Sequence, residues 1–302
     1  MNLQAKSPSN MKNQHRQNST DHLHQFLGDG SRIVNIDNLW AAYQPSQITV
    51  DQVLRILNRV NWVRLDFIEW CRKKNIFLQH PDPIIILGLV SKEEEYNRYL
   101  KLERLEGLKG SLGLTHPVRL VSVLLTDLTA LKSFDVAVVA AHEMIHQMTI
   151  ISGLCPGWHA WPRWLHEGMA MLGDHTAAGN SSKSPTSQSI TEGPGFGSLN
   201  ARRSKVWQKN AMGFEMKSFI RRDLLANPLS HSDDYAACWA LTNGLAHWKK
   251  GRVLTELIDF LKLQELQPES QSTIETVTAE WLIQSLGDDW HDFIMSLQKI
   301  GT

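Results

Sequence analysis

Cysteine is scarce in this chain of 302 residues, which contains only Cys71, Cys155 and Cys238. Three scattered cysteines cannot form a disulfide framework, and no C-x-x-C pair supports a structural zinc knuckle. Long apolar runs are missing as well, because no stretch approaches the roughly eighteen apolar residues that a membrane-spanning helix needs. We therefore expect no membrane span.

An excess of charge of either sign is also absent. Lys and Arg total 31, Asp and Glu total 31, and the formal net charge is zero. Bulk electrostatics therefore favours neither nucleic acid nor an anionic membrane surface as a partner. Local basic pairs do occur, and we interpret them as solvated faces: Arg202-Arg203, Arg221-Arg222 and Lys249-Lys250.

The first 30 residues lack an apolar run and are rich in Gln, Asn, Ser and His. This composition predicts a disordered tail over residues 1–30, and it contains no recognisable export signal. A cytoplasmic protein is the default expectation. Secretion is the alternative, if the start site is misassigned and a signal peptide has been lost.

What the chain does contain is an H-E-x-x-H run from His142 to His146. On an α-helix, residues i and i+4 lie on one face about one turn apart, so the two imidazoles can bind one Zn²⁺ together. Glu143 stands beside the first ligand and can reach a metal-bound water as a general base. The alternative is a pair of hydrogen-bonded core histidines with a solvated glutamate.

The helix that this motif needs is indicated by its flanks. Residues 134–151 are mostly apolar, rich in Ala, Val, Met and Ile, and free of Gly and Pro. Ser133 or Asp135 suits the N-cap, and Gly153 suits the C-terminal end. We therefore predict one continuous helix that carries both histidines on the same face.

A catalytic zinc site needs three protein ligands and one open position for water. Glu167 is our first candidate for the third ligand, on a second predicted helix that begins near Pro162. His166 and His159 are rival candidates. The two motif histidines and one of these three would complete the set.

The second helix has two further features. Gly168 and Ala170 are small, so we expect them to let this helix approach the H-E-x-x-H helix closely. Asp174 follows Glu167 by seven residues, or two turns along the same face, and could fix the tautomer of a motif histidine by accepting its ring N–H. A surface acid at the helix end is the alternative for Asp174.

At these residues the chain resembles the gluzincin metallopeptidases. The segments "HEMIHQ" and "WLHEGMAML" are similar to the gluzincin pattern of H-E-x-x-H followed by a helix reading W-L-x-E-G-x-A. With the later segment "DYAACWALTNGLAH", they most resemble an uncharacterised gluzincin-like family of predicted metallopeptidases, described mainly from planctomycete bacteria. The resemblance covers roughly residues 118–247 and is strong only around the two motifs.

The resemblance implies a zinc site and a reaction. His142, His146 and Glu167 would be the metal ligands, and Glu143 would be the catalytic base. Zn²⁺ would lower the pKa of its bound water to about 7. Glu143 would take the water proton as attack begins and pass it to the leaving amine.

It also implies residues around the metal. Asp174 falls where relatives carry an acid that supports the ligands, whereas His166 replaces an Asn or Ser. Hydrolysis further needs a donor to the developing oxyanion. Tyr235 is the first candidate, because gluzincins often place a Tyr donor downstream of the ligand helix; His166 and His231 are alternatives. Simple packing of the Tyr235 ring is the other interpretation.

The predicted fold class is α+β and mostly α, with a zincin-like small mixed sheet packed on the H-E-x-x-H helix and a helical C-terminal half. Apolar runs predict strands at 84–90 and 118–125, and helical spacing predicts a helix over 49–74. From the gluzincin resemblance, the strand at 118–125 would hold an extended peptide at its free edge. Later helices are predicted near 206–226, 232–248, 252–264, 272–286 and 288–298.

We expect two subdomains after the tail. Residues 31–130 would form an N-terminal α/β subdomain with the edge strand. Residues 131–302 would form a helical, metal-binding catalytic subdomain. Within it, residues 175–205 are rich in Ser, Thr and Gly and are predicted to be a flexible connector.

The leading functional hypothesis is a zinc-dependent hydrolase, most simply a metallopeptidase acting on a peptide or protein substrate. The alternative is a catalytically inactive gluzincin-like scaffold that acts as a binding protein. Mn²⁺ or Co²⁺ could replace zinc, because two nitrogens and one oxygen accept several divalent ions. The sequence alone does not fix the substrate or the oligomeric state.

Overall fold

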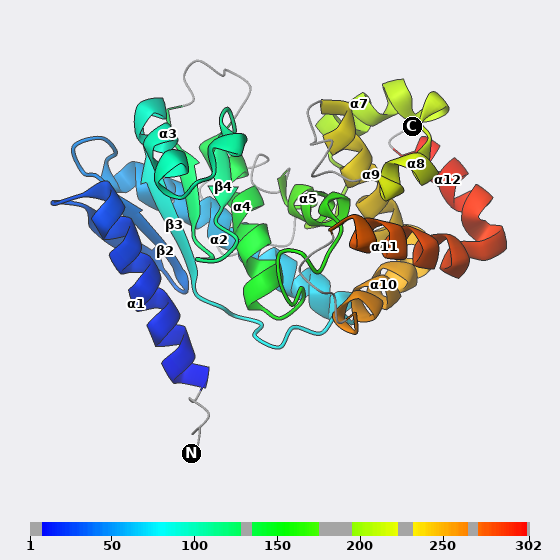
Figure 1. The fold of residues 1–302 in the computed structure, drawn as a ribbon, viewed down its shortest axis with the longest axis horizontal. Coiled ribbons are helices and arrows are strands. Elements are labelled where there is room, and N and C mark those ends of the chain that lie inside the picture. Colours follow the sequence, from blue (N-terminus) through cyan, green and yellow to red (C-terminus); the bar gives the residue numbers. More distant parts are fainter. Residues whose placement is uncertain (1–7, 128–134, 175–194, 223–231, 265–270, 301–302) are drawn as a thin grey trace. The chain divides into compact units, whose positions relative to one another are not determined.

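The computed structural model describes the chain except for residues 1–7, 128–134, 175–194, 223–231, 265–270 and 301–302. The described residues form an α+β fold, mostly helical with a five-stranded mixed sheet, as the sequence predicted (Figure 1). The chain divides into two compact units. The sheet unit comprises Met1–Arg64 and His80–Ile151, and the helical unit comprises Leu65–Gln79 and Ser152–Thr302.

We predicted a boundary between the two subdomains at residue 131, and the observed boundary lies elsewhere. The H-E-x-x-H helix, α4 (Val136–Ile151), lies in the sheet unit and not with the C-terminal helices. The reason is its packing, because α4 lies against β3, β4 and β5 of the sheet. Its buried residues include Ala140, Met144 and Ile145.

The sheet has the strand order β1-β2-β3-β5-β4. β1 (Arg32–Ile36) pairs antiparallel with β2 (Leu39–Tyr43), which runs parallel to β3 (Ile85–Val90). β3 runs parallel to β5 (Ser122–Leu125), and β4 (Gly113–Thr115) pairs antiparallel with β5. The predicted strands correspond to β3 and β5, whereas β1, β2 and β4 were not predicted.

The edge of the sheet is not the strand that we expected. The strand predicted at 118–125 lies between β3 and β4, so both of its sides are paired. Among the described residues, the edge strands are β1 and β4. The Leu125 N–H donates to the Leu112 carbonyl at 2.9 Å, and antiparallel pairing alternates. The N–H and C=O groups of Gly113 and Thr115 therefore point away from β5.

The N-terminal segment is a helix, α1 (Pro8–Leu27), packed on β2 and β3. Leu23, Phe26 and Leu27 are buried in the hydrophobic core of the sheet unit. The predicted disordered tail over residues 1–30 is therefore wrong for Pro8–Leu27. A few apolar residues at helical spacing dock the helix, although its overall composition is polar.

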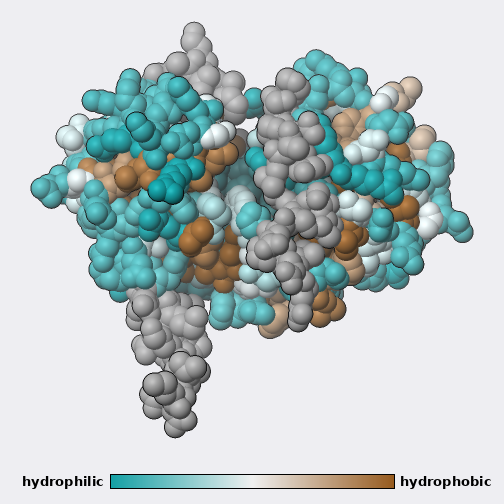
Figure 2. All heavy atoms as spheres, viewed as in Figure 1, coloured by the Kyte–Doolittle hydropathy of each residue, from teal (hydrophilic) through white to brown (hydrophobic). Residues whose placement is uncertain are grey.

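α1 and α3 (Glu93–Leu102) pack over one face of the sheet, and α4 packs over the other (Figure 1). α3 buries Tyr96 and Tyr99 in the core and turns Glu93 and Glu94 to solvent. Hydrophilic residues accordingly cover the visible surface around α3 in Figure 2. The sheet is thus enclosed between helices, which explains why β3 and β5 are buried along their whole length.

α9 (Ser232–His247) is the central helix of the helical unit and is buried along almost its whole length. It packs against α5 (Arg163–Met171), α7 (Ala201–Asn210), α10 (Arg252–Lys262) and α12 (Trp290–Gln298). A helix with so many neighbours needs small residues, and α9 contains four alanines together with Gly244. The helices predicted near 232–248, 252–264 and 288–298 are confirmed.

α11 (Gln271–Leu286) confirms another predicted helix. The helix predicted at 206–226 is broken, because α7 ends before a short 3₁₀ turn and α8 (Met216–Arg221) follows it. Most of the predicted connector, residues 175–194, lies outside the described residues. Its end is helical, since α7 begins at Ala201.

Gly168 was expected to let α5 approach the H-E-x-x-H helix, but within the helical unit it faces α9. A Cβ atom added at Gly168 would lie 2.0 Å from Thr242 Oγ1 and 2.6 Å from the Cys238 carbonyl oxygen. Only a residue without a side chain fits this contact. The small residue in the second motif is therefore explained by packing between α5 and α9.

α2 (Val50–Lys73) confirms the helix predicted over 49–74. At 24 residues it is the longest helix of the described chain, and its sequence is strongly amphipathic and charged. In the described part of the chain, no helix is both long enough and apolar enough to cross a bilayer.

Candidate metal centre

The start of α4 is fixed by a capping residue that the sequence suggested. Asp135 Oδ1 accepts a hydrogen bond from the Ala137 N–H at 2.9 Å, which satisfies one of the free donors of the first turn. Arg59 of α2 holds the other oxygen of Asp135 at 2.7 Å. Gly153, with φ of 72°, follows the helix end as predicted. Ser133, the other candidate cap, lies outside the described residues.

α4 is anchored to the sheet by a buried amide. The Gln147 side chain donates to the Ile86 carbonyl at 2.9 Å and accepts from the Ile86 N–H at 3.1 Å. It also donates to Ser122 Oγ at 2.6 Å. Gln147 thereby fixes the rotation of the turn that carries His146. Sequence reasoning missed this role, because nothing local to the motif shows which backbone groups Gln147 meets.

His142 and His146 lie on one face of α4, as predicted. Their Nε2 atoms are 3.2 Å apart, and the ring planes are at 83°. Two nitrogens bound about 2.0–2.1 Å from one tetrahedral zinc ion would lie about 3.3 Å apart. The spacing of the pair therefore fits two ligands of a common divalent ion, and both side chains are of a type that zinc accepts.

Glu143 is buried and hydrogen-bonded, so the alternative of a solvated glutamate is wrong. Its carboxylate Oε2 accepts a hydrogen bond from Thr115 Oγ1 at 2.8 Å. Thr115 belongs to the edge strand β4 and faces α4. A buried carboxylate that a hydrogen bond holds in place is a suitable group for receiving a proton.

Glu167 lies on α5 in the helical unit and is buried. The first turn of α5 is held by Glu275 of α11, whose Oε1 accepts from the Arg163 N–H at 3.0 Å. Arg163 lies one turn before Glu167, with its Nε 3.9 Å from Glu167 Oε1. Glu275 thus stabilises the helix that presents the candidate ligand, a role that its sequence neighbourhood did not reveal.

His166 is enclosed by aromatic rings within the helical unit. Its ring stacks on Trp158 at 5.1 Å and lies 5.4 Å from Trp161. Its Nε2 is 3.0 Å from the Trp158 carbonyl; a carbonyl only accepts, so this nitrogen carries the proton. A protonated Nε2 cannot bind a metal, so Nδ1 is the nitrogen through which His166 could act as a ligand. His159, the other rival, is exposed.

The burial of His166 predicts acid sensitivity. Burial lowers its pKa to about 4, whereas an unfolded chain takes up this proton near pH 6.5. Stability is therefore complete above pH 6.5 and is lost as the pH falls toward 4. We expect the free energy of unfolding to drop by about 2 kcal/mol between pH 7 and pH 5 through this group alone.

Denaturant unfolding at both pH values, with a chelator present, measures the drop. His166→Gln should lose about that much of the pH dependence, and His291→Gln, at an exposed position of α12, should keep it. An unchanged pH dependence in His166→Gln would contradict the assignment.

Arg203 joins two of the predicted site residues. Its Nη2 is 3.3 Å from Asp174 Oδ2, and its guanidinium lies 5.8 Å from the centre of the Tyr235 ring. The prediction that Arg202 and Arg203 form a solvated face is therefore wrong for Arg203. Asp174 and Tyr235 lie close to this one cation, while their roles toward a metal or an oxyanion stay predictions. His231 lies outside the described residues.

Cys155 lies between the two motifs and is a buried, free cysteine. Its Sγ donates to the Gly157 carbonyl at 3.0 Å, and burial raises the pKa of the thiol to about 12. Trp161 and Trp164 are fully buried. The cysteine and these tryptophans therefore belong to the core of the helical unit.

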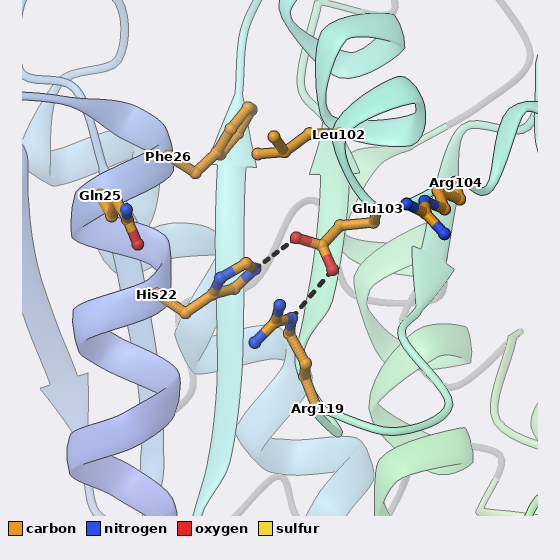
Figure 3. Close-up of a pocket in the computed structure, with 7 residues that line it drawn as sticks. All are labelled: His22, Gln25, Phe26, Leu102, Glu103, Arg104 and Arg119. Carbon is orange, nitrogen blue, oxygen red and sulfur yellow. Dashed lines mark hydrogen bonds and ion pairs between the residues drawn. The ribbon is translucent and has the colours of Figure 1, made fainter.

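A separate pocket of about 600 Å³ opens in the sheet unit, beside α1 and the end of α3 (Figure 3). Glu103 accepts from Arg119 Nε at 2.9 Å and His116 Nε2 at 3.0 Å, and His22 lies 3.5 Å away. Burial alone would raise the pKa of Glu103, but the Arg119 hydrogen bond and the surrounding positive charges outweigh it and lower that pKa. The cluster ties α1 to the rest of the unit.

Two comparisons with known proteins bear on this site. The comparison with curated proteins gives no match. Residues 135–268, slightly less than half of the chain, match a family model described as "Protein of unknown function (DUF1570)". The matched segment contains both motifs, together with Asp174 and Tyr235. Over this segment the chain is similar to a family whose function is uncharacterised.

Proposed function

We propose that this protein is a metal-dependent hydrolase, most simply a zinc metallopeptidase of the gluzincin type with a zincin-like fold. The observation that carries the proposal is the His142–His146 pair, whose Nε2 atoms are spaced 3.2 Å apart on one helix face beside a buried glutamate. A solely structural pair of histidines has no need of Glu143 at that position.

The proposed metal ligands are His142, His146 and Glu167. Each offers one side-chain ligand atom of a type that zinc accepts. Two imidazoles and one carboxylate leave a position open for water on a four-coordinate zinc. The bound ion would supply a water of lowered pKa and would polarise the scissile carbonyl.

Within this proposal, Glu143 removes the water proton and returns it to the leaving amine. The substrate would lie extended along β4, because the main-chain groups of Gly113 and Thr115 point away from β5 and β4 lies against α4. This arrangement moves the proposed peptide-binding edge from the strand at 118–125 to β4. Tyr235 is the proposed donor to the oxyanion.

Metal analysis and peptide hydrolysis test the proposal together. The full chain should hold about one zinc per molecule, and His146→Ala should lose it, since removal of one of three ligands disrupts the site. His291→Ala changes an exposed histidine and should retain the metal. The wild type should cleave members of a quenched fluorescent peptide library, and 1,10-phenanthroline should stop the cleavage.

The two readouts separate the competing functions. Metal bound without cleavage of any peptide favours the inactive binding scaffold. Absence of a tightly held ion would refute the metal site itself. If Mn²⁺ or Co²⁺ restores cleavage better than Zn²⁺ does, the native metal is not zinc, but the proposed reaction stands.

A further inference from the structure

A row of buried polar side chains leads from the sheet to the proposed base. Thr115, Ser122 and Gln147 are all buried, and they join Glu143 through short contacts. Gln147 Nε2 lies 2.6 Å from Ser122 Oγ, which lies 2.9 Å from Thr115 Oγ1, which lies 2.8 Å from Glu143 Oε2. All four residues belong to the sheet unit.

The donor-to-acceptor direction of the hydrogen bonds along this row is set by Gln147. The Ile86 N–H needs an acceptor and the Ile86 carbonyl needs a donor, so the Gln147 amide can adopt only one orientation. One hydrogen of its NH₂ group goes to Ile86. The other hydrogen faces Ser122 Oγ, which must therefore act as an acceptor there.

Each hydroxyl has a single proton to donate. Because Ser122 accepts from Gln147, its own proton is directed onward to Thr115 Oγ1, or to the Glu143 carbonyl at 3.3 Å. The Thr115 proton has the Glu143 carboxylate at 2.8 Å and the Glu143 carbonyl at 2.9 Å as acceptors. The charged carboxylate is the stronger acceptor, so the Thr115 proton goes to Oε2.

We propose that Thr115 is a positioning residue for the base. Its hydroxyl, oriented by Ser122 and Gln147, holds Oε2 of Glu143 and so fixes the orientation of the carboxylate that receives the proton of the attacking water. The water O–H bond then breaks and its proton goes to the Glu143 carboxylate, while the water oxygen bonds to the carbonyl carbon and the C=O π electrons move to the carbonyl oxygen. As this oxyanion collapses, the C–N bond breaks and the proton passes from the carboxylate to the leaving nitrogen. This inference rests on the proposed hydrolytic function.

The test compares two substitutions at one position. Thr115→Val keeps the shape and removes the hydroxyl, and Thr115→Ser keeps the hydroxyl. Because a hydrogen bond to a charged group is lost, we expect Thr115→Val to lower kcat by about tenfold to a hundredfold with KM changed by less than about twofold. Thr115→Ser should restore kcat to within about threefold of wild type, since the hydroxyl proton is still present.

Zinc content and a matched variant exclude a general structural effect. Thr126→Val also removes a hydroxyl bonded in the sheet unit, where Thr126 Oγ1 donates to the Val90 carbonyl at 3.1 Å. It should leave kcat unchanged, and all three variants should bind zinc as the wild type does. If Thr115→Val retains wild-type kcat, or Thr115→Ser is equally slow, the positioning role is overturned. A wild type that cleaves no peptide refutes the proposed function instead.

Discussion

Under the proposed function, we expect Glu143→Gln to leave the metal bound and to lower kcat by about a thousandfold, which is within the range that general-base catalysis contributes. The amide cannot take a proton from water at neutral pH, whereas the carboxylate can. Glutamine has nearly the same shape as glutamate, and its side-chain oxygen can still accept the hydrogen bond from Thr115. The effect should therefore fall on chemistry and not on folding.

Steady-state kinetics and zinc analysis of the same preparation check this expectation. Glu280→Gln makes the same chemical change at an exposed position of α11 and should have wild-type kinetics. A Glu143→Gln enzyme that holds one zinc and keeps most of its activity removes Glu143 from the role of base. Loss of the metal in this variant would instead mean that Glu143 supports the ligands.

Gly168→Ala should destabilise the helical unit strongly. Alanine ordinarily stabilises a helix relative to glycine by up to about 1 kcal/mol, but here the added Cβ would lie 2.0 Å from Thr242 Oγ1 and 2.6 Å from a backbone carbonyl oxygen. α5 and α9 would have to separate to accommodate it. Overpacking of this kind costs about 1–3 kcal/mol and occasionally more, so we expect a loss near the upper end.

Denaturant unfolding measures this loss, and Gly213→Ala is its matched control. Gly213 is in the same unit, and a Cβ there would meet no atom within 4 Å. It should change the free energy of unfolding by less than about 0.5 kcal/mol, as surface substitutions usually do. If Gly168→Ala is equally mild, the close contact between the helices is not present in solution.

The H-E-x-x-H helix could be predicted from sequence because its determinants are local. The apolar run, the Asp135 cap and the i, i+4 spacing all lie within one segment, and each has a meaning that does not depend on tertiary structure. The partners of the glutamate could not be predicted in the same way. Thr115 and Ser122 come from strands about twenty or more residues away, and their placement depends on strand register.

Other differences arose where composition or burial misled. α1 was missed because its many polar residues outweigh the few apolar ones that dock it. β1 and β2 were missed although Asp37 and Asn38 make a two-residue turn between them, a signal typical of hairpins. The face of α5 that carries Gly168 was assigned to the wrong neighbour, because helical spacing shows which residues share a face and not which helix covers it.

If the protein is the proposed hydrolase, the short strand β4 gives it a means of adjusting the base from a distance. It is paired on one side only within the described chain, and a stretch that contains Gly107 and Gly110 precedes it. A shift of that stretch would move the Thr115 hydroxyl and change its hydrogen bond to the Glu143 carboxylate. Under the proposed function, insertions or deletions ahead of β4 would therefore alter the turnover rate without touching any of the proposed metal ligands.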